Sequence, residues 1–452
     1  MQEKSAQAEN ELWNAVGEAL DEEMSTVEDV LESLARTQKG NVKSSIENCM
    51  TILYRDPALK DAICKNELTN KTDIVKPLSW KRNGSCVTDV DMYQIQRYIE
   101  TNYGISNDKA INKAVSIIAS EKSYHPVREF LENLQWDGKS RIASLLPRYL
   151  GADDNKYTRE IMRLLMLAAI HRIYEPGCKF EIMVCLVGGQ GAGKSTFFRF
   201  LAVNDEWFTD DLKRMDDENV YSKMQGHWII EMSEMLATVN AKSIEDIKSF
   251  LSRQKETYRI PYQTYAEDRP RQCIFVGTSN NLDFLPLDRT GNRRFAPVLV
   301  HQERVEKHIL EDEKESREYI VQAWAEAMVI YKNCPHELKL SKEMEEYLKE
   351  MQKQFMPEDT KVGIIQAWLD GCTDEYVCSE MIYREALRHE YEEPKQWEIK
   401  EINSIMNTCI DGWEKISSHR FGKYGLQRGW KRRTNMQGFS PLPENAKTPF
   451  KE

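Results

Sequence analysis

The amino-acid sequence predicts an α/β core that follows an N-terminal helical domain and precedes a small C-terminal helical or winged-helix-like module. Three observations predict this class. Short apolar runs alternate with helical segments from about residue 157 to about residue 300, as in domains built on a parallel sheet. One of these runs, residues 182–187, leads directly into a glycine-rich loop. Apolar residues on either side of this region recur every three or four positions, which is the period of amphipathic helices.

The chain is long enough for several domains, because single cores stop growing at roughly 250–300 residues. We expect five parts: an acidic helical arm over residues 1–40, a helical domain over 41–150, the α/β core over 151–335, the C-terminal module over 336–435 and a disordered tail over 436–452.

Composition narrows the class of protein. Hydrophobic residues make up 41% of the chain and charged residues 30%, as in ordinary globular proteins. No apolar run reaches the ~20 residues that a membrane span needs, and the polar N-terminus does not resemble a signal peptide. The ten cysteines form no C-x-x-C pair, which argues against a zinc site and favours free thiols in a reducing compartment. We therefore expect a cytoplasmic protein without membrane contact.

Charge is distributed unevenly along the chain, whose net charge is −11. Residues 1–35 hold ten acids and one lysine, whereas residues 415–433 hold seven lysines and arginines and no acid. A basic surface at one end is compatible with nucleic-acid binding even in an acidic chain.

The N-terminal arm carries an apolar stripe in which large apolar residues recur every seven positions from Trp13 to Leu34. Thr26 is placed to cap a new helix with Asp29 in its first turn, which would divide the arm into two short helices. We expect the stripe to pack on the arm's own domain, and a partner helix is the alternative.

Residues 41–150 are predicted to be mostly helical. Four segments show helical apolar spacing, at residues 44–56, 91–104, 107–121 and 126–134. The run "DVD" at 89–91 has the form of a metal-binding D-x-D motif. Because helical spacing follows it directly, we expect these residues to cap a helix instead.

The glycine-rich loop "GGQGAGKST" fits the pattern G-x-x-x-x-G-K-S in full, with a strand before it and a helix after it. In such a loop, backbone N–H groups surround phosphates, and the following helix points its positive end at them. Lys194 is expected to reach the β- and γ-phosphates, and Ser195 to ligate Mg²⁺. The sequence therefore predicts a site for ATP and Mg²⁺, formed by Gly188, Gly189, Gln190, Gly191, Ala192, Gly193, Lys194, Ser195 and Thr196.

Two further strands are expected to bring polar groups to this site. "GHWIIEMSEM" (226–235) is a strand that ends in Glu231, which we expect to hold the metal, and Glu234 follows as a candidate to orient the attacking water. The two roles could be exchanged. "QCIFVGTSNN" (272–281) is a strand whose end carries Asn280, a candidate sensor of the γ-phosphate. Its neighbour Asn281, or a purely turn-forming asparagine, is the alternative.

Arg293 and Arg294 follow a predicted turn at Gly291 and begin the next strand. Two interpretations stay open at this point. The arginines could form structural ion pairs with Asp283 or Asp288, or they could meet phosphate charge in their own or a neighbouring subunit.

Six segments of the chain occur in a characteristic order: "YHPVREFLENLQWDGKSRI" (124–142), "PGCKFEIMVCLVGGQGAGKST" (176–196), "WIIEMSEM" (228–235), "YRIPY" (258–262), "FVGTSNNLDFLPLDRTGNRRFAPV" (275–298) and "QAWAEAM" (322–328). Together they resemble the virulence-associated protein E family. Its members are phage- and satellite-encoded P-loop ATPases, similar to superfamily 3 replicative helicases of the AAA+ class. The resemblance covers roughly residues 45–435 and is far more specific than the loop alone.

The resemblance implies an ATP-driven ring, usually a hexamer, that moves on single-stranded DNA. Many relatives carry a primase-polymerase domain before the ATPase, whereas the first 150 residues here are short for one and lack paired acids and zinc ligands. Priming is therefore expected of a separate primase or initiator. The family's motifs match this sequence at Lys194 and Ser195 (Walker A), Glu231 and Glu234 (Walker B), Asn280 (sensor) and Arg293 or Arg294 (an arginine finger that completes the neighbour's site).

Two regions are candidates for contact with single-stranded or forked DNA. Residues 252–272 interleave cations with tyrosines, the ingredients of single-strand binding, and in superfamily 3 relatives a hairpin here enters the ring channel. Ion pairing within an ordinary hairpin, or a solvated basic tail, is the alternative for each region. The candidate DNA-binding residues are Lys255 and Arg259 in the hairpin, and Lys423, Arg428, Lys431 and Arg432 in a basic β-wing of the C-terminal module.

The sequence favours a DNA helicase or translocase that acts in the replication of a phage or mobile element. An initiator in which ATP only controls assembly is the main alternative. A P-loop kinase of small molecules is less favoured, because the paired arginines and the asparagine at a strand end are not needed for it.

Overall fold

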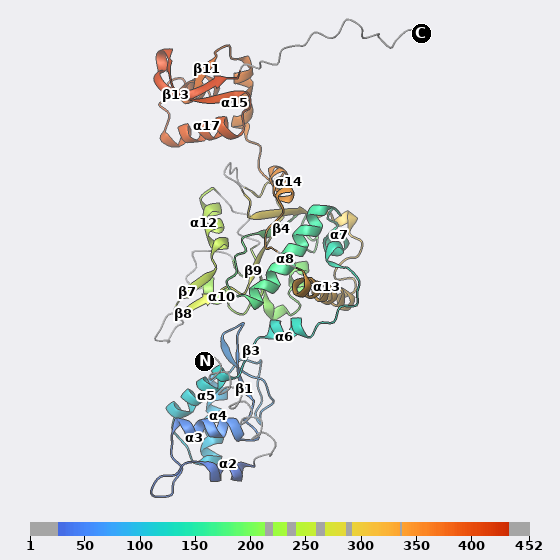
Figure 1. The fold of residues 1–452 in the computed structure, drawn as a ribbon, viewed down its shortest axis with the longest axis vertical. Coiled ribbons are helices and arrows are strands. Elements are labelled where there is room, and N and C mark those ends of the chain that lie inside the picture. Colours follow the sequence, from blue (N-terminus) through green and yellow to red (C-terminus); the bar gives the residue numbers. More distant parts are fainter. Residues whose placement is uncertain are drawn as a thin grey trace, which may run out of the picture. The chain divides into compact units, whose positions relative to one another are not determined.

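The computed structural model describes residues 26–212, 220–232, 241–258, 267–285, 292–334 and 337–433. The chain divides into two units, one formed by residues 1–282 and 293–351 and the other by residues 283–292 and 352–452. No helix in the described ranges is both long and apolar enough to cross a bilayer. Figure 1 shows the order of the elements along the chain.

The first part of the large unit combines helices with a small sheet. Its elements are α2 (Val27–Ser33), α3 (Ile46–Arg55), β1 (Ile63–Asn66), β2 (Lys71–Ile74), α4 (Asp89–Tyr103), α5 (Asp108–Glu121) and β3 (Ser123–Tyr124). β1 pairs antiparallel with β2 and parallel with β3. All four helical segments predicted over 41–150 are present, as α3, α4, α5 and α6 (Pro126–Glu132), and the small sheet is the part that the sequence did not predict. Strands of two to four residues that carry polar side chains give no periodic signal in the sequence.

Two predicted helix starts are confirmed. Thr26 caps α2 in a capping box with Asp29, and the part of the acidic arm before residue 26 lies outside the described residues. The "DVD" run begins α4, where Thr88 is the N-cap and Asp91 completes the capping box. Asp91 also accepts a hydrogen bond from Nε of Arg82 at 2.8 Å. These contacts give the aspartate a capping role and no metal ligand is needed to explain it.

The α/β core contains a five-stranded sheet of β4 (Met183–Val187), β5 (Phe208–Thr209), β6 (Ile229–Glu231), β9 (Ile274–Ser279) and β10 (Phe295–Leu299). The strand order is β10-β4-β9-β6-β5, and every pair is parallel. Strands buried on both faces are continuously apolar, as the sequence predicted for these runs. The fold is therefore mixed α/β with a parallel sheet. All five carboxyl ends meet at one edge, where ligands bind in open parallel sheets.

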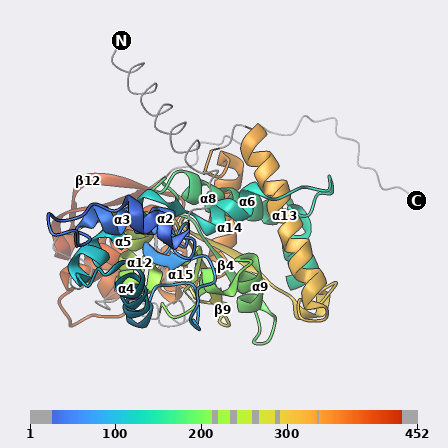
Figure 2. The ribbon, with the colours of Figure 1, turned by 90° about the horizontal axis from the view of Figure 1, so that it is seen from below.

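Helices cover this sheet and share its core. α8 (Lys156–Tyr174), α9 (Lys194–Leu201) and α13 (Glu313–Asn333) lie close together in Figure 2, and α8 is also seen beside α13 in Figure 1. Two buried tryptophans connect them: the rings of Trp228 and Trp324 lie 4.4 Å apart. The indole of Trp228 donates to the carbonyl of Ala169 at 3.0 Å, and that of Trp324 to Leu201 at 2.8 Å. Large buried aromatic rings with satisfied N–H groups fix the helices against the strand that carries Glu231.

Smaller elements complete the unit: α6 (Pro126–Glu132), η1 (Ile142–Ser144), α7 (Leu145–Leu150), η2 (Asp205–Trp207), α10 (Val220–Met224), α12 (Ala241–Ser252), the antiparallel hairpin of β7 (Lys255–Tyr258) and β8 (Glu267–Pro270), η3 (Gln302–Arg304) and α14 (Lys342–Lys353).

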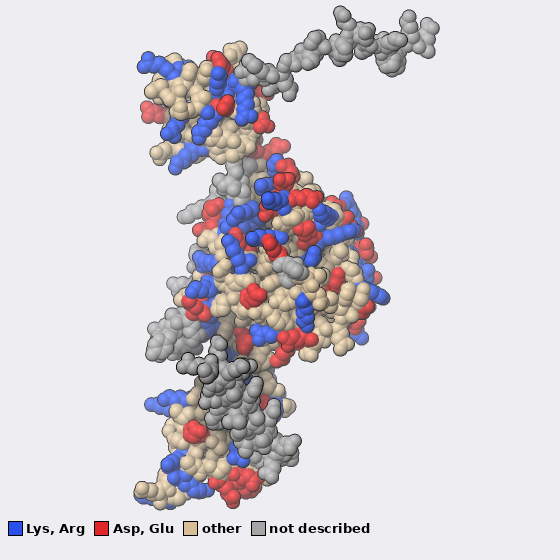
Figure 3. Space-filling model, viewed as in Figure 1, with Lys and Arg blue, Asp and Glu red and all other residues tan. Residues whose placement is uncertain are grey.

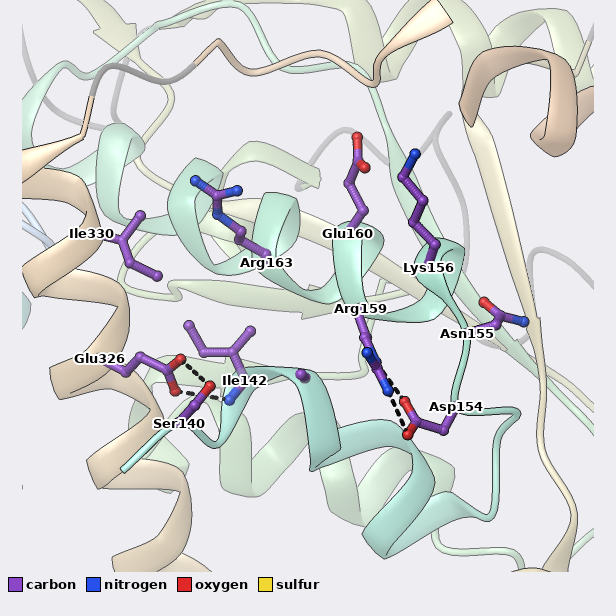
Figure 4. Close-up of a pocket in the computed structure, with 11 residues that line it drawn as sticks. Ser140, Ile142, Asp154, Asn155, Lys156, Arg159, Glu160, Arg163, Glu326 and Ile330 are labelled. Carbon is purple, nitrogen blue, oxygen red and sulfur yellow. Dashed lines mark hydrogen bonds and ion pairs between the residues drawn. The ribbon is translucent and has the colours of Figure 1, made fainter. Parts of the chain in front are cut away.

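Two of the six segments that carried the family resemblance hold each other in place. The side chain of Gln322 on α13 accepts from the backbone N–H of Asp137 at 3.0 Å and donates to the carbonyl of Gln135 at 3.0 Å. One turn further on, the buried carboxylate of Glu326 accepts from the hydroxyl of Ser140 at 2.6 Å and from the backbone N–H of Ile142 at 3.0 Å. Figure 4 shows this carboxylate beside both partners, in a pocket that α8 also lines. α13 therefore fixes the chain that enters α7.

The C-terminal unit follows the order helix, strand, helix, helix, strand, strand. Its elements are α15 (Thr360–Gly371), β11 (Tyr376–Cys378), α16 (Ser379–Met381) with the π-helical turn η4 (Ile382–Ala386), α17 (Gln396–Thr408), β12 (Trp413–Phe421), η5 (Gly422–Tyr424) and β13 (Gly425–Arg432). The sheet order is β11-β13-β12, and both pairs are antiparallel. This is the arrangement of a winged helix, in which β12 and β13 form the wing. Trp413 and Trp430 belong to its core, whereas Trp397 is 57% exposed.

Candidate nucleotide site

The glycine-rich loop joins the carboxyl end of β4 to the first turn of α9. Gly188 lies so close to the next strand that a Cβ would meet the Val300 carbonyl oxygen at 2.7 Å. Gly193, the N-cap of α9, has a φ of +77°, which residues with a Cβ rarely adopt. Gly188 and Gly193, the two glycines that the motif requires, are therefore explained by the backbone: one allows a close approach to a neighbouring strand and the other a positive φ. The loop leaves the N-terminus of an eight-residue helix open toward the edge of the sheet.

Lys194 crosses the loop and reaches the next strand. Its side chain is buried, and Nζ donates to the carbonyl oxygens of Gly188 at 2.7 Å and Gly189 at 2.8 Å. A third bond reaches Oδ1 of Asn280 at the end of β9, at 2.9 Å. Burial lowers the pKa of the Lys194 ammonium, and the negative charge of Glu231 opposes that shift. The structure thus brings together the lysine and the asparagine that the sequence singled out separately.

Glu231 ends β6 and is fully buried. Oε1 accepts from the hydroxyl of Ser195 at 2.8 Å and from the hydroxyl of Thr278 on β9. Oε2 has no hydrogen-bond partner among the described residues. Burial raises the pKa of this carboxyl, and the two hydroxyl donors counteract the rise. A buried carboxylate oxygen without a partner, next to a serine hydroxyl, fits the oxygen ligands that Mg²⁺ prefers.

These groups surround a cavity of about 530 Å³ at the carboxyl edge of the sheet. It is lined by residues 190–196 of the loop and residues 278–281 of the strand end. Asn281 lines it too, although the lysine contact is made by Asn280. Glu234 lies outside the described residues. The cavity is large enough for a nucleotide, because small-molecule sites measure roughly 300–1,000 Å³.

Arg293 and Arg294 lie at the opposite edge of the sheet. The backbone N–H of Met183, the first residue of β4, donates to the carbonyl of Arg294 at 2.7 Å. Nε of Arg294 also pairs with Glu181 at 2.9 Å and donates to the hydroxyl of Ser252 at 3.0 Å. Arg293 is 3.9 Å from Glu181, and its side chain is 72% exposed. Among the described residues, the ion-pair partner of both arginines is Glu181 and not Asp283, and Asp288 lies outside the described residues.

The predicted DNA-binding residues have different surroundings. Lys255 on β7 forms an ion pair with Asp268 on β8, and Arg259 lies outside the described residues. In the same hairpin, Arg271 is buried against Glu256. This is the ion pairing that the sequence left open as the alternative for the hairpin.

The four basic residues predicted in the wing also differ. Lys423 pairs with Glu385 at 3.3 Å, and Lys431 pairs with Glu375 at 3.3 Å. Arg432 donates to the carbonyl oxygens of Leu369 at 3.0 Å and Cys372 at 2.6 Å, so it caps the end of α15. Arg428 is exposed and forms no hydrogen bond or ion pair with the described residues. The geometry therefore leaves Arg428 open to a ligand and gives Arg432 a structural role.

Two residues at or near the site were missed by sequence reasoning. Thr278 lies within the quoted run "GTSN", and its hydroxyl at a strand end was a usable signal. Glu181 gave no signal, because its arginine partners lie more than a hundred residues away and the pairing of β4 with β10 brings them together.

Comparison with known proteins gives one family match. The family model described as "Virulence-associated protein E-like domain" matches residues 131–357, which is half of the chain. Two A-form apo structures of the NrS-1 C-terminal region, one of them described as residues 305–718, match with 13% sequence identity and a TM-score of 0.44, covering 82% of this chain and 96% of that chain. No curated protein matches the chain. The family match includes the glycine-rich loop, Glu231, Asn280 and both arginines.

Proposed function

This chain belongs to the virulence-associated protein E-like domain family, and from that premise we propose that it is an ATP-hydrolysing motor that acts on DNA in the replication of a phage or other mobile element. The observation that carries the proposal is the convergence of three strand ends. β4 supplies Lys194 and Ser195 through its loop, β6 supplies Glu231, and β9 supplies Asn280. These are the groups that phosphoryl transfer from ATP requires, since the protein's task there is positioning and charge stabilisation.

The hydrogen bonds of the site suggest how it would receive ATP. Lys194 would exchange its carbonyl partners for β- and γ-phosphate oxygens while Asn280 keeps it aimed along the loop. Ser195 and Glu231 would hold Mg²⁺, which neutralises charge on the phosphates when bound. Glu231 must be charged for this role, and its burial disfavours the charge until a cation arrives. Glu234 remains the candidate to orient the attacking water.

The position of the two arginines supports action between subunits. They lie at the amino end of β4, and the phosphate loop lies at its carboxyl end. Five residues of parallel strand span about 16 Å, which is farther than an arginine side chain reaches. A phosphate that meets Arg293 would therefore belong to another subunit of a ring. The exposure of Arg293 makes it the better finger, while Arg294 anchors the turn through Glu181.

The test is ATP hydrolysis measured with and without single-stranded DNA, at low and moderate salt. We expect DNA to stimulate hydrolysis several-fold, and we expect the stimulation to weaken as salt rises, because phosphate contacts are salt-dependent. Lys194→Ala should abolish hydrolysis and the unwinding of forked DNA while assembly is retained.

Hydrolysis that is indifferent to DNA would favour an ATP-controlled assembly factor or a kinase. Unwinding that survives in Lys194→Ala would refute the motor.

A further inference from the structure

The wing of the C-terminal unit has two faces with different chemistry. The indole of Trp430 on β13 donates to Asn407 on α17 at 3.0 Å, so α17 lies across the face that carries Trp430. Because side chains alternate along a strand, Arg428 and Leu426 lie on that same face. The register adds two residues of β12, since Lys415 pairs with Trp430 and Arg420 with Leu426. We call Lys415, Arg420, Leu426 and Arg428 the α17 side of the wing.

The cations on the α17 side of the wing have no hydrogen-bond or ion-pair partner in the part of the chain that the structure describes. Lys415, Arg420 and Arg428 are exposed, and none forms a hydrogen bond or an ion pair with the described residues. Glu414 is the single acid in the described stretch 412–433. It pairs in register with Lys431, which places it on the opposite face. In Figure 3 the surface of this unit that faces the reader carries more blue than red. The α17 side of the wing therefore has a net positive charge that no described residue neutralises.

The exposed surface of α17 carries groups that can contact bases. Gln396 and Lys400 are exposed and one helical turn apart, so they share a face of the helix. Trp397 is 57% exposed beside them. Glutamine and lysine are among the residues that read base edges in the major groove, which is wide enough to admit an α-helix.

We propose that α17 and the α17 side of the wing form a binding surface for duplex DNA. The helix enters the major groove, and Lys415, Arg420 and Arg428 contact the phosphates of the flanking backbone. Leu426, which is 71% exposed between the two arginines, packs against the sugar edge that the wing crosses. The surface lies entirely in the C-terminal unit and includes no residue of the nucleotide site. With this surface the proposed motor would bind double-stranded DNA in addition to the single strand on which it is proposed to move.

The experiment compares two pairs of substitutions in the same hairpin. Arg420→Ala/Arg428→Ala removes two charges from the α17 side. Lys423→Ala/Lys431→Ala also removes two charges, but from residues paired with Glu385 and Glu375. Binding of a fluorescent 20-base-pair duplex to the full chain is measured by anisotropy from 50 to 200 mM salt, without nucleotide. The first pair should weaken binding about ten- to a hundredfold and reduce the salt slope by about two, one for each lost phosphate contact. The second pair should weaken it no more than about twofold.

Equal losses from both pairs would overturn the proposal, since they would indicate attraction by overall charge alone. The proposal would also be overturned if neither pair of substitutions weakened duplex binding. Circular dichroism of both variants checks the fold. Lys194→Ala serves as the reference for the motor: it should bind duplex like the wild type. Failure of the ATPase proposal therefore leaves this measurement interpretable.

Discussion

His125 is a buried imidazole whose environment favours the neutral form. It caps α6, where Nδ1 accepts the backbone N–H of Arg128 at 3.3 Å, and its other ring nitrogen has no hydrogen-bond partner among the described residues. Burial, together with the positive charge of Arg128, lowers the pKa of His125 to about 4. The folded state therefore resists protonation at pH values where the unfolded chain accepts a proton.

This residue predicts a specific loss of stability in acid. The folded pKa is below the unfolded one, so the contribution is fully present above about pH 6.5 and is lost as the pH falls toward 4. Between pH 7 and pH 5 the free energy of unfolding should drop by about 2 kcal/mol through this group. His125→Asn keeps a capping oxygen and should remove that part of the pH dependence, measured by urea unfolding at both pH values.

The exposed His308 provides the control, since His308→Asn should leave the pH dependence of the wild type in place. If His125→Asn loses as much stability between pH 7 and pH 5 as the wild type, the buried imidazole is not responsible.

At the residue scale, the groups of the nucleotide site were readable from sequence where they sit in a local motif. Lys194 and Ser195 are fixed by the glycine pattern, and Asn280 by its place at a strand end. Thr278 and Glu181 were not identified because their partners are set by tertiary pairing between strands. The sequence also could not predict which of the neighbouring residues Arg293 and Arg294 is exposed. It depends on the direction in which each side chain leaves the start of β10.

At the element scale, long periodic helices and apolar strands were predicted well. α8 (Lys156–Tyr174) begins where the α/β pattern was predicted to begin, at about residue 157, and the strand expected at 182–187 is Met183–Val187. The sheet of β1, β2 and β3 was missed because its stability comes from contacts with α3 and α5 and from a buried network in which Tyr124 donates to Asp73 at 2.7 Å. A polar residue buried by its partners looks like a loop residue in the sequence.

α13 predicts a large effect of one carboxylate. Glu326 accepts from a hydroxyl and two backbone N–H groups at the entry to α7. Glu326→Ala leaves these buried donors without partners, so the free energy of unfolding should fall by about 2–3 kcal/mol. Urea unfolding at neutral pH measures it.

Glu318 lies on the same helix and is exposed, so Glu318→Ala should change stability by no more than about 0.5 kcal/mol. Equal effects of the two substitutions would show that Glu326 does not hold the α7 segment.

At the scale of the whole molecule, the two ends of β4 predict complementation between defective subunits. Lys194→Ala damages the phosphate loop, and Arg293→Ala damages the opposite edge of the sheet. In a mixed ring, some interfaces combine an intact loop with an intact arginine. We expect mixtures of the two variants to regain ATPase activity that neither has alone, with a maximum near equal amounts, measured by phosphate release.

Co-assembly of the two variants is checked by energy transfer between labelled subunits. Mixed rings that form but regain no activity at any ratio would rule out action across the interface. Arg294→Ala should instead lower the melting temperature, because its guanidinium ties the turn to Glu181 and Ser252.

At the scale of the whole molecule, the sequence predicted the type of C-terminal module but not which of its basic side chains are exposed. The basic stretch near residue 420 indicated a wing, and the helix before it indicated a winged-helix module, since both signals are local. Which cations face outward was not readable. Arg428 and Arg432 are two full strand repeats apart, yet one is exposed and the other caps α15. That difference follows from where the strand passes the end of a helix.

β4 also links the phosphate loop mechanically to the arginines at its other end. A buried strand bonded on both sides changes length very little, so a displacement at one end reappears at the other. Its carboxyl end opens into the phosphate loop, and just before its amino end Glu181 holds Arg294 and lies near Arg293. In the proposed ring, if the loop moves when a phosphate departs, the arginines that we propose to contact the adjoining subunit move with it. One short strand would then carry the timing signal from each site to the next around the ring, without any change in the fold of the subunit.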